Sequence, residues 1–347
     1  MISIAGRPIG PGHPPYVVAE MSGNHGGDLD RALAIVDAAA GAGAHAVKLQ
    51  TYRPDTITID ADGPAFRIGA DHRLWGGASL YRLYERAQTP WEWHERIFAH
   101  AARRGLAAFS SPFDPTAVEL LESLGVPAYK IASSEIVDLP LIRLAARTGK
   151  PLIVSTGMAT VEEVCAAVRA AREAGCAELA VLACTASYPA RPEESHLRAL
   201  PLLREITGAV VGLSDHTPGI GAAVAAVALG ACLVEKHVTL SRADGGVDAA
   251  FSLEPAELSA LVTESERAWR ALGEARIGPR PGEREGLRFR RSLYVVRDVR
   301  AGEPVTELNI RSIRPAGGLH PDLAATVLGR RFTRDAAKGT PLTWDLL

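Results

Sequence analysis

Two histidines in the second half of the chain each end a short apolar run that is typical of a buried β-strand. His216 follows Val210–Ser214, and His237 lies near the end of Cys232–Thr239. Neutral imidazoles suit Mn, Zn, Fe or Co, and two protein ligands leave coordination positions open for water and substrate. If both runs are neighbouring strands of a parallel barrel, the imidazoles share one mouth, and the pair predicts a divalent metal site. Taken alone, either histidine is more often a hydrogen-bonded core residue.

The elements that would position these histidines are repeated βα units. From Tyr16 to Leu272, short apolar or β-branched runs alternate with helical patterns, which is the signature of an α/β fold. Eight units predict a closed (β/α)8 TIM barrel, with a doubly wound open sheet as the competing arrangement. The strand candidates are Tyr16–Met21, Ala46–Thr51, Leu106–Ser111, Ala128–Ser133, Leu152–Thr156, Leu179–Thr185, Val210–Ser214 and Cys232–Thr239.

Polar residues end nearly every one of these runs. Active sites of such barrels are built from the carboxyl ends of the strands, so the endings predict a ring of functional groups around one cavity. Each ending alone could simply mark where a strand meets water. The lysines and serines suit a compact, doubly anionic ligand, and a Schiff-base lysine is the alternative. The ring comprises Glu20, Lys48, Gln50, Ser110, Ser111, Lys130, Ser133, Ser155, Thr156, Thr185, Ser214, His216, Glu235 and His237.

Outside this rhythm, three segments differ in composition. Arg53–Tyr84 is long and holds several prolines and glycines, which predicts an extended loop over the barrel mouth. Residues 274–290 are rich in Gly, Pro, Arg and Glu, which predicts a linker after a barrel domain of residues 1–273, with a phosphate-binding arginine strip as the alternative. Two short strand patterns, Leu293–Val296 and Arg311–Arg314, predict a small β-rich domain over residues 291–347.

Composition excludes several classes of partner. The formal net charge is −2, which implies no bulk attraction to nucleic acid or to an anionic membrane. The four cysteines form no CxxC pair, and Met1–Pro15 has no signal-peptide core. The apolar stretch Gly221–Val234 is shorter than the roughly 20 residues that a membrane span needs. These features predict a cytoplasmic protein.

Seven motifs, in order, resemble the sialic acid synthase family. The resemblance runs nearly end to end, and Phe289–Leu293 and Arg311–Pro315 resemble the antifreeze-like (SAF) domain of these enzymes. The motifs are Ala19-Glu20-Met21-Ser22-Gly23-Asn24-His25, Val47-Lys48-Leu49-Gln50-Thr51, Tyr129-Lys130-Ile131-Ala132-Ser133, Ser155-Thr156-Gly157, Cys184-Thr185-Ala186-Ser187-Tyr188-Pro189, Gly212-Leu213-Ser214-Asp215-His216-Thr217 and Glu235-Lys236-His237.

The resemblance implies a transferase that condenses phosphoenolpyruvate, a co-substrate, with an open-chain amino-sugar aldehyde and releases phosphate. It implies that His216 and His237 hold a divalent metal (Mn, Mg or Co) as a Lewis acid. Glu20 becomes the candidate for proton transfer, although it could merely pair with a lysine. The implied phosphoenolpyruvate ligands are Lys48, Ser111, Lys130, Ser133, Ser155 and Ser214.

The sugar side is implied in the same way. Arg314 would enter from the second subunit of a domain-swapped homodimer. The family often has Asn or Ser at the position of Ala186, where this chain has no side-chain donor. Thr185 or Ser187 would then take over that contact with phosphoenolpyruvate. The residues that match positions near the sugar are Gln50, Tyr188, Asp248 and Phe289.

Further stretches, among them Thr89–His94 and Gly245–Pro255, look most like the branch of the family that makes pseudaminic acid from a diacetamido-trideoxy-L-altrose. Enzymes that make neuraminate or legionaminate usually have Gly-Ile-Asn-His where this chain has Ser22-Gly23-Asn24-His25. Those two activities are the first alternatives. A non-catalytic carbohydrate- or ice-binding protein and a metal-dependent aldolase are the others, and the intact lysine and histidine ring counts against the binding protein.

Overall fold

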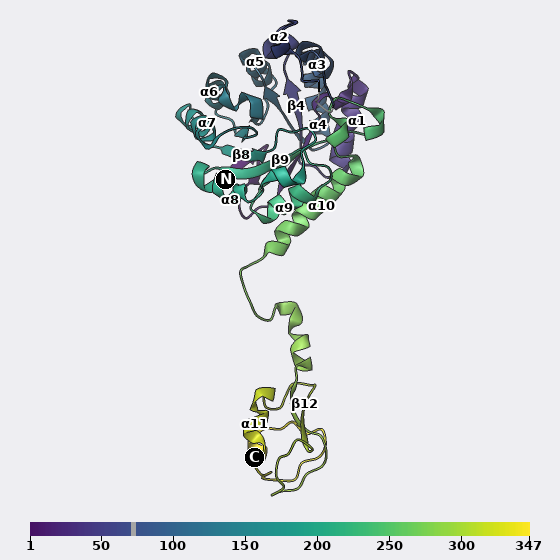
Figure 1. The fold of residues 1–347 in the computed structure, drawn as a ribbon, viewed down its shortest axis with the longest axis vertical. Coiled ribbons are helices and arrows are strands. Elements are labelled where there is room, and N and C mark those ends of the chain that lie inside the picture. The colour runs from purple at the N-terminus through teal and green to yellow at the C-terminus, as the bar shows by residue number, and fades with distance from the viewer. Residues whose placement is uncertain (71–73) are drawn as a thin grey trace. The chain divides into compact units, whose positions relative to one another are not determined.

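A closed parallel barrel forms the first part of the chain in a computed structural model, which describes residues 1–70 and 74–347. Each of its eight strands is hydrogen-bonded to the next, and the last closes on the first. The predicted TIM barrel is therefore confirmed (Figure 1). The strands are β3 (Tyr16–Glu20), β4 (Ala46–Thr51), β5 (Ala107–Pro112), β6 (Tyr129–Ile131), β7 (Leu152–Ser155), β8 (Leu179–Cys184), β9 (Val210–Asp215) and β10 (Leu233–His237).

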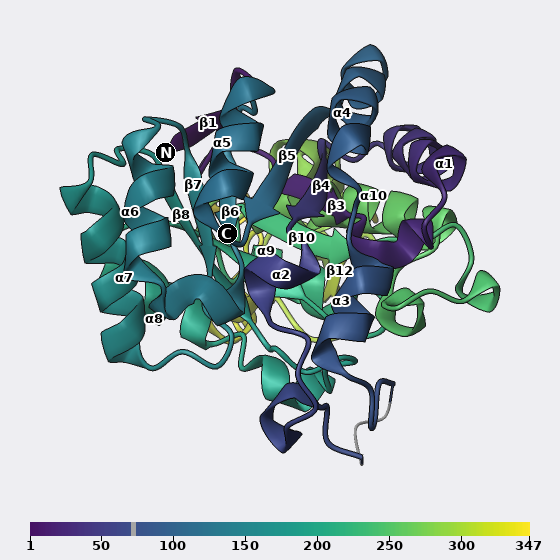
Figure 2. The same ribbon diagram turned by 90° about the horizontal axis from the view of Figure 1, so that it is seen from above.

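Helices surround the strands, as the view from above shows (Figure 2). Local sequence fixes where they begin: the Asp28 carboxylate caps α1, and Thr160 with Glu163 forms a capping box at α7. The longer helices are α1 (Leu29–Gly41), α4 (His94–Arg103), α5 (Pro115–Ser123), α6 (Leu139–Arg147), α7 (Val161–Glu173), α8 (Ala199–Thr207), α9 (Gly221–Ala228) and α10 (Pro255–Leu272). Short 3-10 turns are η1 (Ser22–His25), η3 (Trp91–Trp93), η4 (Ser133–Val137), η5 (Pro192–Ser195), η6 (Arg242–Asp244) and η7 (Ala249–Phe251).

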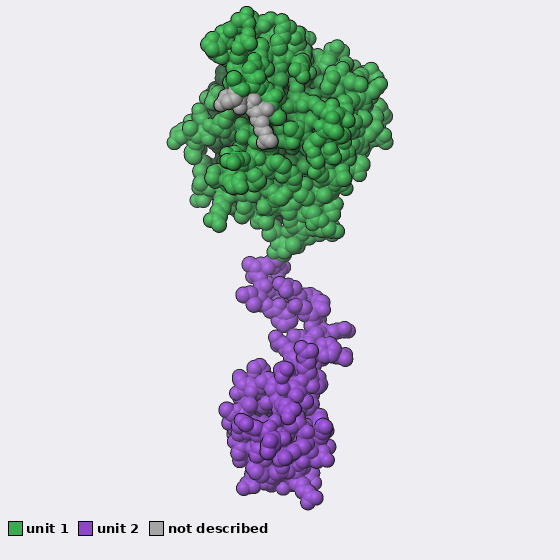
Figure 3. Space-filling model, turned by 45° about the vertical axis from the view of Figure 1, so that its right-hand side comes forward, with its two compact units in different colours: residues 1–273 green, residues 274–347 purple. Residues whose placement is uncertain are grey.

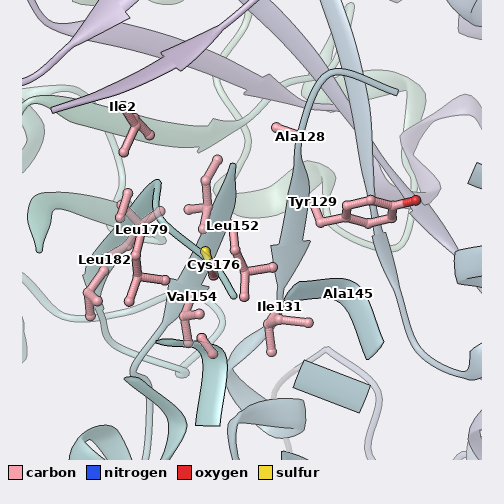
Figure 4. Close-up of a cluster of buried hydrophobic side chains, with 14 of the residues drawn as sticks. Ile2, Ala128, Tyr129, Ile131, Ala145, Leu152, Val154, Cys176, Leu179 and Leu182 are labelled. Atoms are coloured by element: carbon pink, nitrogen blue, oxygen red, sulfur yellow. The ribbon is translucent and has the colours of Figure 1, made fainter. Parts of the chain in front are cut away.

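The core lies inside the barrel and between strands and helices, because parallel strands are buried on both faces. Figure 4 shows part of it, where Leu152, Val154 and Leu179 pack in one buried cluster with Ile2. Ile2 belongs to a hairpin of β1 (Ile2–Ile4) and β2 (Arg7–Ile9). The Ser3 backbone N–H donates to Glu178, the residue before β8. The hairpin thus packs at the amino ends of the strands and leaves the carboxyl ends for the site.

The segment predicted as one extended loop, Arg53–Tyr84, holds more helix than expected. It contains α2 (Pro54–Ile57) and η2 (Pro64–Phe66), and α3 (Leu80–Ala87) already begins at Leu80. Residues 71–73 of that prediction lie outside the described residues. Proline at the first helical position explains α2, since its missing N–H is not needed there. The prediction of a continuous loop is therefore wrong for these helical parts.

A second compact unit follows, and the two units, residues 1–273 and 274–347, are coloured separately in Figure 3. It has its own apolar cluster, which includes Leu293, Val295 and Phe332. Among the described residues, no helix is both long and apolar enough to cross a membrane. The elements of this unit are η8 (Pro281–Glu283), η9 (Glu285–Phe289), β11 (Ser292–Val295), β12 (Ile310–Ile313), η10 (Pro321–Leu323), α11 (Ala324–Val327) and η11 (Trp344–Leu346), with β11 and β12 antiparallel.

Candidate active site

The two histidines at the ends of β9 and β10 lie side by side. Their ring centroids are 5.2 Å apart. The His216 Nδ1 lies 2.8 Å from the Thr185 carbonyl oxygen, so this nitrogen carries the proton and donates, and Nε2 keeps its lone pair. The His237 Nδ1 lies 3.4 Å from the Asp248 carboxylate but has no partner at hydrogen-bonding geometry. The rings of Phe251 and Tyr188 complete the wall around the pair, with Tyr188 4.5 Å from His216.

A divalent metal fits this histidine pair. The orientation of His216 leaves Nε2 as a ligand atom, and a buried carboxylate next to His237 is the usual outer partner of a ligating imidazole. Among residues 1–70 and 74–347, no cluster of three or more His, Cys, Asp or Glu side chains could hold a metal. Such an ion would therefore have two protein ligands, and water or substrate would fill its other positions.

A buried ion pair behind the strands places both histidines. The Lys236 ammonium lies 2.7 Å from the Asp215 carboxylate, and both side chains are fully enclosed. Lys236 and Asp215 are partners in the β9–β10 register and directly precede His237 and His216. The Lys236 ammonium also donates to the Thr217 carbonyl oxygen. The backbone on both sides of His216 is thus tied to β10.

The two lysines predicted to bind phosphoenolpyruvate are paired with carboxylates. The Lys48 ammonium lies 2.6 Å from Glu20 and donates to Ser111 at 3.2 Å. The Lys130 ammonium donates to Glu235 at 3.1 Å, and Ser214 donates to the same carboxylate oxygen at 3.3 Å. Lys48 is also 3.6 Å from Glu235. Two cations and two anions therefore meet at the centre of the mouth.

Burial and charge act against each other in this cluster. Burial disfavours the charged form of Glu235, but Lys130 and Lys48 hold the pKa of Glu235 well below its usual range. Burial likewise disfavours the Lys48 ammonium, yet Glu20 and Glu235 outweigh it and raise the Lys48 pKa. For Lys130, burial dominates and lowers the pKa despite Glu235. The cluster contains both charge signs without bulk water.

The serines at the ends of β6 and β7 form a tight cradle. The Ser133 hydroxyl accepts the Gly157 backbone N–H at 3.0 Å. A Cβ atom at Gly157 would lie 2.7 Å from that hydroxyl and 3.0 Å from the Ala186 methyl group, so only glycine fits. The Ser155 hydroxyl is buried and has no hydrogen-bond partner. An unpaired buried hydroxyl at the mouth is a group that a ligand would satisfy.

The predicted sugar residues fall into two groups. Tyr188 and Asp248 lie at the histidine pair, and Gln50 is half-buried in β4, two residues after Lys48. Phe289 and Arg314 belong to the second unit, where both are exposed. The first unit therefore brings together every other predicted site residue. The roles of Phe289 and Arg314 stay predictions.

Sequence reasoning missed or misplaced several groups. Glu235, which the sequence placed in the ring of polar strand endings, accepts hydrogen bonds from Lys130 and Ser214. Glu135, in η4, was not singled out, although burial raises the pKa of its carboxyl to about 7 and one of its oxygens has no partner. Its position two residues after Ser133 was the available signal. His25, which nothing in the sequence placed in the interior, is buried and hydrogen-bonded to Thr89.

Comparison with known proteins places this site in a family. The model of the NeuB family matches residues 35–276, and that of the SAF domain matches residues 290–347. The chain belongs to the NeuB family. The predicted membership of the sialic acid synthase family, the antifreeze-like domain and the prediction of a transferase enzyme are thereby confirmed.

Members of the NeuB family with known names are similar over nearly the whole chain. The pseudaminic acid synthase of Helicobacter pylori is 42% identical over 96% of this chain and 97% of its own length. The N,N'-diacetyllegionaminic acid synthase of Campylobacter jejuni is 33% identical over 92% of this chain and 96% of its own. The N-acetylneuraminic acid synthetase of Leptospira borgpetersenii, solved with citrate, superposes with a TM-score of 0.72 at 32% identity, covering 82% of this chain and 94% of that one.

Proposed function

We propose that this NeuB-family enzyme is a pseudaminic acid synthase, which condenses phosphoenolpyruvate with a diacetamido-trideoxy-L-altrose and releases phosphate. The observation that carries the proposal is the meeting of the histidine pair with the paired lysines at one barrel mouth. The 42% identity to a pseudaminic acid synthase, against 33% to a legionaminate enzyme, favours this sugar over its isomers.

Phosphoenolpyruvate would bind over the lysine–glutamate cluster and the serine cradle. Lys48, Ser111 and Ser155 supply donors to its anionic groups, and Ser155 gains the partner that it lacks. The sugar aldehyde would lie at the histidines, beside Tyr188 and Asp248. Holding both substrates in this order converts a bimolecular encounter into an oriented one.

In the reaction, carbon 3 of phosphoenolpyruvate attacks the aldehyde carbon, water adds at carbon 2, and phosphate leaves with cleavage of its bond to carbon 2. A divalent metal on His216 and His237 would supply Lewis-acid polarisation of the aldehyde oxygen. Glu20, whose carboxylate touches Lys48, is the proposed acceptor for the proton of the added water. Glu135, with a pKa raised to about 7 by burial, is a second group able to hold a proton at this mouth.

The second unit has a proposed role as well. We propose that the SAF domain delivers Arg314, and with it Phe289, to the sugar of a second subunit in a homodimer. The exposed position of Arg314 at the end of β12 supports this, since its guanidinium is available to a partner. A bidentate guanidinium suits a carboxylate or a sugar oxygen pair.

The test is phosphate release from phosphoenolpyruvate with a panel of hexosamines. The altrose-configured diacetamido sugar should give the highest kcat/KM, above its legionaminate-type isomer and N-acetylmannosamine. If another member of the panel is preferred, the chain is a different nonulosonic acid synthase with the same chemistry. Absence of phosphate release with every sugar, at saturating Mn²⁺, would refute the proposed activity.

A further inference from the structure

The Asp248 carboxylate is held by a serine in an unfavourable backbone conformation. Ser22 has φ 47°, in the left-handed region that favours glycine, and its hydroxyl donates to Asp248. A non-glycine residue in such a region is strained, and glycine would avoid that strain. The hydrogen bond from the Ser22 hydroxyl compensates for the backbone strain at this position. Asp248 is thus oriented from η1, outside the strand that carries His237.

Gly23, the next residue, lies where three segments of the mouth meet. A Cβ atom here would lie 2.6 Å from the Val247 side chain and about 3 Å from the Ala87 backbone at the end of α3, at 3.0 Å from its oxygen and 3.1 Å from its Cα. Val247 directly precedes Asp248 in the loop after β10. A side chain at position 23 must therefore displace either that loop or the end of α3. Because Gly23 has no side chain, the loop that carries Val247 can approach η1 this closely.

The same turn holds the loop from its other side. The Asn24 amide donates to the Val238 carbonyl oxygen at 2.9 Å and to the Ser252 hydroxyl at 2.8 Å. Ser252 in turn donates to the Asp248 carbonyl oxygen at 2.7 Å. Residues 22–24 thus contact both the side chain and the backbone of Asp248, directly or through Ser252.

A cavity borders this loop. Its volume is about 530 Å³, and it is lined by Val247, Ala250, Leu83 and Arg86 together with the glycine-containing turn at residues 74–78. The Trp75 indole donates to the Val247 carbonyl oxygen at 3.0 Å, and its ring lies 6.0 Å from Tyr188. Any shift of Val247 changes this wall as well as the direction of Asp248.

We propose that Ser22 and Gly23 determine which acetamido sugar the enzyme accepts, by fixing Asp248 and Val247 against the histidine pair. Ser22 acts through Asp248 and is a positioning residue, while Gly23 sets the space at Val247. The ligand class is an open-chain acetamido hexose. The Asp248 carboxylate would accept hydrogen bonds from its hydroxyl groups. This inference rests on the proposed function.

The test compares Ser22→Gly, Ser22→Ala and Gly23→Ala with the wild-type enzyme on two sugars, the altrose-configured diacetamido sugar and N-acetylmannosamine. Loss of the hydroxyl should raise the KM for the diacetamido sugar about tenfold or more, as expected for a lost hydrogen bond to a charged group. The KM for phosphoenolpyruvate should stay within about twofold, since the serine cradle is not touched. Gly23→Ala, like the Ser22 variants, should lower the preference for the diacetamido sugar over N-acetylmannosamine.

Ala5→Gly is the matched control. Ala5 has φ 49° in the turn of the β1–β2 hairpin, so this variant relieves the same kind of strain at the opposite end of the barrel. It should change no sugar parameter. Ser22→Gly should unfold at a higher temperature than Ser22→Ala, because both variants lose the hydroxyl contact but only glycine removes the backbone strain.

Two results would count against the inference, and they differ. If the wild-type enzyme uses the diacetamido sugar but both Ser22 variants keep its sugar KM and preference, the inference fails and the proposed function stands. If the wild-type enzyme releases no phosphate with any sugar, the proposed function fails and this inference falls with it.

Discussion

Replacing Lys236 by Met tests what holds the histidine pair in place. The Lys236 and Asp215 side chains are 0% and 1% exposed and their charged atoms are 2.7 Å apart. Removing one partner of such a buried pair leaves an uncompensated charge and costs about 3–5 kcal/mol. The free energy of unfolding should fall by that amount. A barrel with a stability of about 10 kcal/mol, in the middle of the typical range, stays folded at 25 °C after such a loss.

The position of the pair adds a second expectation. Lys236 and Asp215 precede the two histidines, and Lys236 also holds the Thr217 carbonyl oxygen. The double variant Lys236→Met with Asp215→Leu replaces the ion pair by apolar groups, which is often neutral for stability. Its unfolding free energy should therefore return close to the wild-type value. Its affinity for Mn²⁺ should not return, because the hydrogen bonds around His216 are absent.

Urea unfolding measures the first quantity, and calorimetric titration with Mn²⁺ measures the second. Lys150→Met is the matched control, since the Lys150–Glu122 pair is partly exposed and such pairs contribute about 0–1 kcal/mol. The reasoning is refuted if the double variant binds Mn²⁺ and turns over as the wild type does. The buried pair would then contribute to stability only.

Three further perturbations address the site itself. His237→Ala should abolish calorimetrically detectable Mn²⁺ binding while the far-UV circular dichroism spectrum is kept, and unchanged binding would contradict the ligand assignment. Glu135→Gln should match the wild type in stability below pH 4.5 and exceed it above pH 7. The reason is that burial raises the pKa of the Glu135 carboxyl from 4.5 to about 7. A shift of that size corresponds to a stability difference of about 3 kcal/mol above pH 7. The stabilising effect of the bound proton is complete below the unfolded pKa and is lost as pH rises through 7, so equal urea midpoints at pH 8 would oppose this assignment. Arg314→Ala should raise the KM for the sugar more than that for phosphoenolpyruvate, and normal sugar kinetics would refute the shared site.

Much of the barrel could be predicted from the sequence because parallel strands are buried on both faces. Runs such as Leu152–Thr156 and Leu179–Thr185 are apolar without interruption, and the strands β7 and β8 occupy nearly the same residues. The proximity of His216 and His237 could be predicted because their strands are consecutive in the chain, and consecutive strands of a barrel are neighbours. The helices after β4 were missed, because the glycines and prolines of Arg53–Tyr84 masked two short helical starts.

The contacts inside the mouth could be predicted only in part. Successive side chains of a strand point to opposite faces, so Glu235 and His237 face inward while Lys236 faces outward. That alternation was available from the sequence, and it places Glu235 on the inner face beside the lysines. The pairing of Lys48 with Glu20 depends on the β3–β4 register, which the sequence does not specify.

The paired lysines change how an anionic substrate must be bound. Because Glu20 and Glu235 already neutralise Lys48 and Lys130, the cluster offers no excess positive charge to a ligand that carries both a phosphate and a carboxylate. Neutral donors such as Ser155 contribute hydrogen bonds but no charge. The missing positive charge has to come from outside the cluster, and the divalent ion proposed at the histidine pair would be one source of it. The affinity for phosphoenolpyruvate should therefore depend on the metal, so that His237→Ala weakens its binding even though no lysine or serine is altered.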